Sequence, residues 1–277
     1  MFYRVTGAAV RAALVAGAIA TPSLLLTTQN IQTPELVVFA AIIAAILVFA
    51  EYNTVFPSFV EFRDAPPLNR LRFFAFFGTI LALTLIAKNG VAPTELTAAL
   101  AGFGAQVGEM LDFPYSPVRL VVLMLPQDAP PALLTDLRVA AAMSYMICLT
   151  AILLFVAAIR VRGWPTGKGS FNVWTNLPLF DPTAGGDVVE RLYRDARVNI
   201  ILGVLLPFII PAAVKLASSM IDPLMLSNPH VMIWTIAAWA FLPASLIMRG
   251  IAMARIADLI EDKRRRTYAQ AEDMQTV

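Results

Sequence analysis

Residues 160–199 read RVRGWPTGKGSFNVWTNLPLFDPTAGGDVVERLYRDARVN, a long polar segment that separates two hydrophobic runs and organises the rest of the chain. A shorter segment of the same kind runs from Glu51 to Arg72. The rest of the chain is mostly apolar: of 277 residues, 58% are hydrophobic and 14% charged, and the mean hydropathy is +0.72. Soluble domains carry roughly 45–50% apolar and about 25% charged residues. The composition therefore predicts an all-α polytopic membrane protein.

Six hydrophobic runs have about the length that a helix needs to cross a bilayer, roughly 20 residues. The predicted transmembrane helices occupy residues 8–27, 34–50, 71–87, 139–159, 200–220 and 230–248. A signal peptide, with Ala18-Ile19-Ala20 as cleavage motif, competes with the first of them; we favour a transmembrane helix. The runs form one transmembrane domain, residues 1–266, before a polar C-terminal tail at 267–277.

The basic residues indicate the orientation, because cytoplasmic loops are enriched in Lys and Arg. With a cytoplasmic N-terminus, 17 of the 21 basic residues fall in cytoplasmic segments, and three fall in outer ones: Lys88, Arg119 and Arg138. Lys215 lies within the fifth span. The cytoplasmic set is Arg4, Arg11, Arg63, Arg70, Arg72, Arg160, Arg162, Lys168, Arg191, Arg194, Arg197, Arg249, Arg255, Lys263, Arg264, Arg265 and Arg266. Both termini and segment 160–199 are therefore predicted to be cytoplasmic, and segment 89–137 to be outside.

The scarcity of reactive side chains limits the chemistry that one chain can perform. Cys148 is the only cysteine and His230 the only histidine, so an intramolecular disulfide, a cysteine metal cluster and a bis-histidine haem are excluded. We predict no catalytic residue, metal or cofactor, and the net charge of +2 gives no reason to expect a nucleic-acid partner. The excess of Arg over Lys and the abundant Ala are typical of a GC-rich bacterial genome. We expect the protein in the bacterial inner membrane.

The outer segment contains a predicted helix that begins at Pro93-Thr94-Glu95. One face carries a bulky apolar stripe, and another is small and includes Gly104 and Gly108, four residues apart. Glycine costs about 1 kcal/mol in a helix relative to alanine, so these positions suggest close approach of a neighbour. The stripe consists of Leu96, Leu100, Phe103, Val107 and Met110. Gly104 and Gly108 are therefore a candidate partner interface; an interfacial helix resting on the bilayer is the alternative.

The cytoplasmic segment ends in a second predicted amphipathic helix that leads into span five. Asp187 and Glu190 have the spacing of a capping box, and Arg191 and Arg194 follow on the polar side. These four residues are a candidate partner interface. The alternative is an interfacial turn held at the lipid headgroups by arginine, with Trp164 and Trp174 at headgroup level. The basic run at 263–266 is expected to attract anionic lipid.

The fifth span carries the candidate functional residues Lys215, Pro207 and Pro211. A charge within a span is costly, so Lys215 suggests a substrate or ion role; snorkelling to the outer interface is the alternative. The prolines permit kinks. Six spans, cytoplasmic termini and a cytoplasmic helix between spans four and five resemble the general plan of ABC-type permease subunits. The Glu-Ala-Ala with downstream Gly of that family is missing, so we do not assign the chain to it.

Two functions from different classes are consistent with these observations. The first is a non-catalytic accessory or assembly subunit of a larger inner-membrane complex, which contacts the bilayer and a protein partner or a second copy of the chain. The second is a small-solute transporter or permease subunit that uses the kinked spans five and six. A membrane enzyme has the least support, because no nucleophile–base pair, metal cluster or nucleotide motif is evident in the sequence.

Overall fold

A computed structural model describes residues 2–26, 34–165, 172–181, 183, 185–218, 220 and 222–275, and within these ranges the chain is helical with no strand. Six helices are long and apolar enough to cross a membrane. They are α1 (Phe2–Leu25), α2 (Pro34–Asn53), α3 (Leu68–Asn89), α6 (Pro131–Arg162), α8 (Val188–Leu216) and α9 (Pro229–Gln275). Each predicted span overlaps one of them, although the predicted end of the first span, Thr27, lies outside the described residues. An all-helical chain with six such helices is therefore confirmed.

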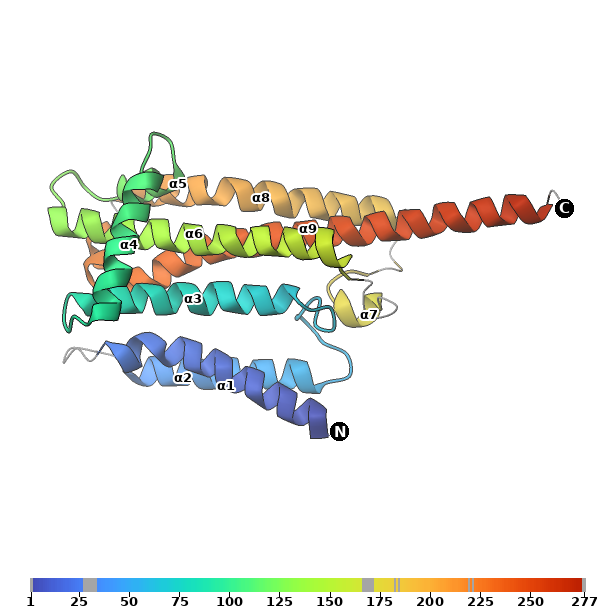
Figure 1. Ribbon diagram of the computed structural model, residues 1–277, viewed down its shortest axis with the longest axis horizontal. Coiled ribbons are helices and arrows are strands. Elements are labelled where there is room, and N and C mark those ends of the chain that lie inside the picture. Colours follow the sequence, from blue (N-terminus) through green and yellow to red (C-terminus); the bar gives the residue numbers. More distant parts are fainter. Residues whose placement is uncertain are drawn as a thin grey trace.

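Successive long helices run in opposite directions, so the connections gather at two ends of the bundle (Figure 1). The termini end holds both chain ends, the segment between α2 and α3, and the segment between α6 and α8, which includes α7 (Val173–Asn176). The opposite end holds α4 (Glu95–Leu111), α5 (Pro117–Val122) and the short helix η2 (Pro223–Ser227). The described parts of all segments predicted to be cytoplasmic thus lie at the termini end.

Helices α8 and α9 pack with their backbones unusually close together. A Cβ atom added at Gly203 would lie 2.7 Å from the Pro243 carbonyl oxygen, and one added at Gly250 would lie 2.7 Å from the Ala196 carbonyl oxygen. Both contacts are with backbone, which cannot move aside as a flexible side chain can. Small residues at helix crossings permit this approach in membrane bundles, and the contacts explain why glycine occurs at both places.

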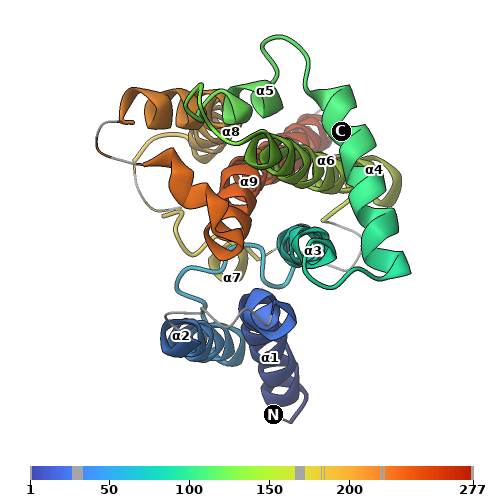
Figure 2. The same cartoon turned by 90° about the vertical axis from the view of Figure 1, so that its left-hand side faces the viewer.

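The hairpin of α1 and α2 lies beside the main bundle of α3, α6, α8 and α9 (Figure 2). Helix α1 contacts α3, while α2 is the least buried of the six long helices. Its exposed apolar side chains are Leu36, Val38, Phe39, Ile42, Ile43, Ile46 and Leu47. An uninterrupted apolar surface of this kind is compatible with contact with lipid hydrocarbon.

Helix α4 lies across α6 and α3 at the opposite end of the bundle (Figures 1 and 2). Its predicted start is confirmed: Thr94 is the N-cap, and Thr94 and Thr97 form a reciprocal capping box. Gly104 and Gly108 are buried, and a Cβ at Gly104 would lie 2.8 Å from Val139 Cγ1 of α6. Their assignment to a partner interface needs correction, because the neighbour that approaches these glycines is another helix of the same chain.

We expect Gly104→Leu to loosen α4 from the bundle, because the added side chain would meet Val139 and also Met143, whose Cγ lies 3.3 Å from the Cβ position. Overpacking of this kind costs roughly 1–3 kcal/mol. Gly102→Ala is the matched control: its Cβ position has no heavy atom within 4 Å, so alanine should be neutral or slightly stabilising. Limited proteolysis of segment 89–131 and thermal unfolding in detergent measure both effects. Equal behaviour of the two variants would contradict the intramolecular contact.

Two helices extend well beyond the predicted apolar spans. Helix α8 begins at Val188, twelve residues before the predicted span at 200, and α9 continues to Gln275 through most of the predicted tail. Hydropathy defines only the part of a helix that suits lipid, whereas the helical hydrogen bonds continue until a cap or a breaker ends them. Asp187 caps the start of α8, and no proline follows Pro243 in α9.

Candidate functional site

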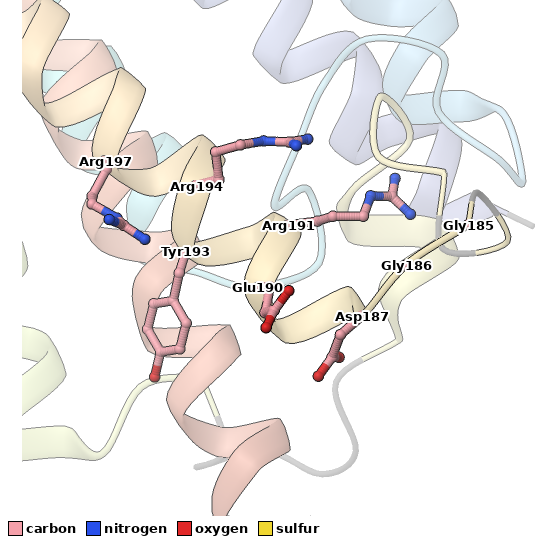
Figure 3. A pocket seen from close by; sticks show the side chains of 8 residues that line it. All are labelled: Gly185, Gly186, Asp187, Glu190, Arg191, Tyr193, Arg194 and Arg197. Carbon is pink, nitrogen blue, oxygen red and sulfur yellow. The ribbon is translucent and has the colours of Figure 1, made fainter.

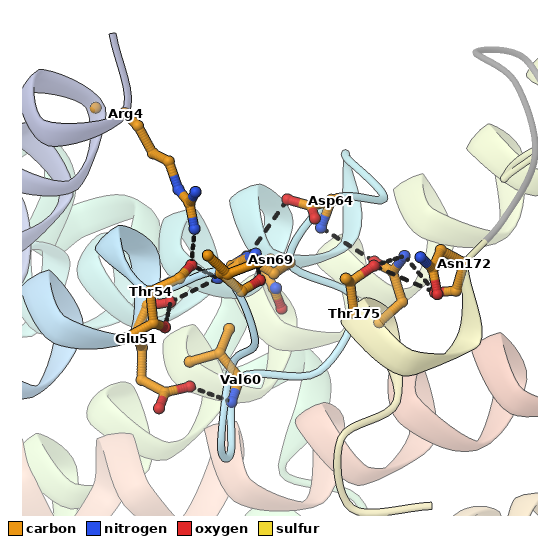
Figure 4. A network of polar contacts seen from close by, with 12 residues as sticks. Arg4, Glu51, Thr54, Val60, Asp64, Asn69, Asn172 and Thr175 are labelled. Atoms are coloured by element: carbon orange, nitrogen blue, oxygen red, sulfur yellow. Dashed lines mark hydrogen bonds and ion pairs between the residues drawn. The ribbon is translucent and has the colours of Figure 1, made fainter. Parts of the chain in front are cut away.

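The connection between α2 and α3 is an ordered loop built on two charged side chains. The Glu51 carboxylate accepts hydrogen bonds from the backbone N–H groups of Ser58, Phe59 and Val60 at 3.0–3.1 Å. Arg63 donates to the Glu51 and Thr54 carbonyl oxygens at 2.8 and 2.9 Å and to that of Val55 at 3.0 Å. Arg4 of α1 also donates to the Thr54 carbonyl (Figure 4). These hydrogen bonds within the protein define the shape of the loop. The loop is therefore more than a turn anchored at the lipid headgroups.

This loop packs directly against the second polar segment. Asn176 accepts hydrogen bonds from two loop N–H groups: its carbonyl oxygen accepts from Phe62 at 2.6 Å and its Oδ1 from Asp64 at 3.0 Å. Trp164 donates from Nε1 to the Ala65 carbonyl oxygen at 3.0 Å, and its ring lies 5.7 Å from that of Phe62, centroid to centroid. Together the two connections form a small apolar core at the termini end.

The interpretation of Trp164 as a ring in contact with lipid headgroups needs correction. Its side chain is only 4% exposed, and it packs between Phe62 of the loop and Phe155 of α6. The interfacial interpretation assumed that each polar segment met the membrane alone, whereas the two segments meet each other. The side chain of Trp174 and residues 166–171, which include Lys168, lie outside the described part of the structure.

A buried ion pair ties the loop to α9. The Glu61 carboxylate accepts two hydrogen bonds from Arg249, at 2.5 Å from Nε and 2.8 Å from Nη2. The Glu61 side chain is 5% exposed and that of Arg249 is 23% exposed. Arg72 of α3 interacts electrostatically with both and donates from Nη2 to the Ser245 carbonyl at 2.9 Å. One carboxylate therefore balances two guanidinium groups where α3, α9 and the loop meet.

The four residues predicted as a cytoplasmic interface line one hollow of about 790 Å³ at the start of α8. Figure 3 shows Asp187, Glu190, Arg191 and Arg194 with the other lining residues, Gly185, Gly186, Tyr193 and Arg197. The sequence prediction that these residues share a surface is therefore consistent with the structure. Three arginines against two carboxylates give the lining an excess of positive charge.

Several side chains of this hollow are held in place by neighbouring elements. Asp187 accepts from the Val189 backbone N–H at 2.9 Å and pairs with Arg264 of α9 at 2.9 Å. The Val189 N–H and the Arg264 guanidinium hold the pKa of the Asp187 carboxyl below its usual range, so this link weakens only as the pH falls through that lowered pKa. Arg191 donates to the Asp181 carbonyl at 2.7 Å.

The contacts between α8 and α9 were missed by sequence reasoning. In addition to Arg264, Tyr193 of α8 donates from its hydroxyl group to Asp258 of α9 at 2.6 Å. The predicted capping box is only half supported: Asp187 caps the second helical N–H, whereas Glu190 is an exposed residue of the hollow. Nothing local in the sequence indicates which charge of α9 faces α8, because that depends on how the helices are rotated.

The remaining predicted residues lie toward the opposite end of α8. Pro207 and Pro211 are buried within the helix, and the Pro207 carbonyl oxygen accepts from Trp239 Nε1 of α9 at 3.1 Å. Lys215 lies in the last turn of α8, where its Nζ donates to the Leu125 carbonyl oxygen at 3.0 Å. The structure therefore separates Lys215 from the hollow at the termini end, since the two sites lie at opposite ends of one helix.

Within the described ranges, no group of three or more His, Cys, Asp or Glu side chains could hold a metal ion. The described residues form an all-helical protein with six helices able to span a membrane. At its termini end the α2–α3 loop and the described part of the α6–α8 connection pack together. Comparisons with protein-family models, with characterised proteins and with solved structures found no match for it.

Proposed function

We propose that this protein is a non-catalytic integral membrane protein that serves as an accessory or assembly subunit of a larger bacterial inner-membrane complex, with its termini end in the cytoplasm. The orientation is supported by the distribution of basic residues, since cytoplasmic loops are enriched in Lys and Arg. The described parts of the segments that contain these 17 of the 21 basic residues lie at the termini end; Lys168 is outside the described residues.

The observation that carries the proposal is the length of α9. Its 47 residues span about 70 Å, more than twice the roughly 30 Å thickness of bilayer hydrocarbon. Figure 1 shows its C-terminal part projecting past the rest of the bundle. Residues 262–271 are exposed all around the helix. Bridging to another domain is one role of a helix with a polar surface on all sides, and stabilisation by ion pairs four residues apart is another. This projecting segment and the adjacent hollow together form a docking surface for a protein partner.

A C-terminal truncation tests this role. A chain that ends at Arg266 keeps the Arg264–Asp187 and Arg265–Glu261 ion pairs but loses the exposed end of α9. We expect the truncated chain to elute as the full-length protein does but to lose its co-purifying partner after gentle solubilisation, as identified by mass spectrometry. If the full-length chain purifies only as itself or as a homo-oligomer, or if the truncation retains every partner, the accessory role is contradicted.

A small-solute permease is the second candidate, favoured by the two buried prolines in α8. Kinked helices permit the movement that alternating access needs. Gly203 of α8 lies close to the backbone of α9, and Gly250 of α9 lies close to the backbone of α8; these contacts oppose movement between the two helices. Uptake of candidate solutes into proteoliposomes distinguishes the candidates, because only the permease function predicts transport by the isolated protein.

A further inference from the structure

A second hollow, of about 540 Å³, lies at the opposite end of the bundle, and three basic side chains converge on it from three helices. Arg119 comes from α5, Arg138 from α6 and Lys215 from α8. Only four basic residues occur in the outer segments and the outer part of span five, and three of these four line this one hollow. Their convergence is therefore not a consequence of a generally basic surface.

The charges around the hollow do not balance. Asp112, whose side chain is 7% exposed, pairs with both arginines: Arg119 Nε lies 3.0 Å from Oδ1 and Arg138 Nε lies 2.7 Å from Oδ2. One carboxylate thus faces two guanidinium groups, and Lys215 adds a third positive charge. None of the lining residues in the described chain is acidic. An anion in the hollow would offset the remaining two positive charges.

The basic groups are held in position rather than free to spread apart. Lys215 uses one of its three N–H donors on the Leu125 carbonyl oxygen, which keeps its ammonium group at the hollow. Asp112, the C-cap of α4, holds both guanidinium groups. Arginine matches the geometry of phosphate oxygens with several N–H donors, and lysine contributes a compact charge beside it.

The walls of the hollow indicate what carries the anion. Val122, Leu123 and Leu134 contribute apolar surface beside the basic groups, and Leu123 is 54% exposed. Lys215 lies in the last turn of an apolar helix, which is headgroup level for a helix that spans a bilayer. A phosphate beside an apolar surface at this depth is the chemistry of a phospholipid headgroup.

We propose that Arg119, Arg138 and Lys215 form a binding site for a phosphate group, carried by an anionic phospholipid of the leaflet at the opposite end. The site is independent of the proposed accessory role, because it uses none of the residues of the docking surface. It assigns a binding function to Lys215 that requires no transport.

Binding of lipid to the purified full-length chain in detergent tests this proposal. Native mass spectrometry measures retention of phosphatidylglycerol, with zwitterionic phosphatidylcholine as the comparison lipid. Lys215→Gln is expected to weaken phosphatidylglycerol binding by about fivefold, from the roughly 1 kcal/mol that one basic residue contributes near an anionic headgroup. Arg119→Gln is an independent second variant with the same expected direction. Lys88→Gln is the matched control, because Lys88 also lies in the last turn of a long apolar helix but does not line the hollow.

The experiment distinguishes a lipid-borne phosphate, a free anion and the absence of a phosphate site. Preference for phosphatidylglycerol that is reduced by Lys215→Gln or Arg119→Gln and unchanged in Lys88→Gln supports a lipid-borne phosphate. Stabilisation of the wild type by millimolar inorganic phosphate, lost in the same variants and without preference between the lipids, supports the phosphate site but assigns it to a free anion. Equal loss in Lys88→Gln, or no response to either source in a folded wild type, overturns the proposal.

Discussion

Replacing Glu61 with alanine is expected to destabilise the protein by about 3–5 kcal/mol, the typical cost of removing one partner of a buried ion pair. The substitution leaves Arg249 and Arg72 close together, with no described carboxylate hydrogen-bonded to either. It also removes the two hydrogen bonds that link the loop to Arg249 of α9. Unfolding in mixed micelles with increasing denaturing detergent measures the loss.

Asp64→Ala is the matched control for this result. Asp64 lies in the same loop and pairs with Arg63 at 3.4 Å, but its side chain is 55% exposed. Exposed ion pairs contribute about 0–1 kcal/mol, so this variant should unfold nearly as the wild type does. Similar losses in the two variants would mean that the loop, rather than the buried charge, determines the effect.

Trp164→Ala should cost about 3–5 kcal/mol, as expected when a buried large aromatic side chain is truncated. The change removes contacts with Phe62 and Phe155 and leaves the Ala65 carbonyl oxygen without its hydrogen-bond donor. A tryptophan that only anchored the chain at the headgroups would give a much smaller change. The free energy of unfolding therefore distinguishes a role in the small core from a role at the membrane surface.

Trp164→Phe separates the two contributions of this side chain. Phenylalanine keeps an aromatic ring between Phe62 and Phe155 but cannot donate to the Ala65 carbonyl. The expected loss is about 1–3 kcal/mol, the cost of leaving a buried acceptor unpaired. A loss as large as that of Trp164→Ala would show that phenylalanine cannot fill the space.

Much of the local structure could be predicted because it depends on neighbours in the sequence. The start of α4 at Thr94 and the cap of α8 at Asp187 follow from residues within one helical turn. The shared surface of Asp187, Glu190, Arg191 and Arg194 follows from helical periodicity. The role of Gly104 and Gly108 could be predicted only in part, since periodicity indicates that something approaches a small face but does not identify it.

The hollow at the opposite end could not be predicted from the sequence. The position of Lys215 within an apolar run makes it unusual in the sequence, but its contact with the Leu125 carbonyl joins residues 90 positions apart. In the sequence, nothing distinguishes Arg119 and Arg138 from other charged residues of the long outer segment and its end. In the structure, α5 and α6 bring both side chains to the same hollow. Their meeting depends on how that connection folds back on the bundle.

The six long apolar helices can be predicted from hydropathy and length, because these two properties decide which segments suit a bilayer. Which charged and aromatic side chains meet depends on tertiary packing: Glu61 meets Arg249, 188 positions away, and Trp164 meets Ala65, 99 positions away. These contacts depend on the rotation and register of helices far apart in the chain. No local pattern encodes either quantity, because each is set by the packing of the whole bundle.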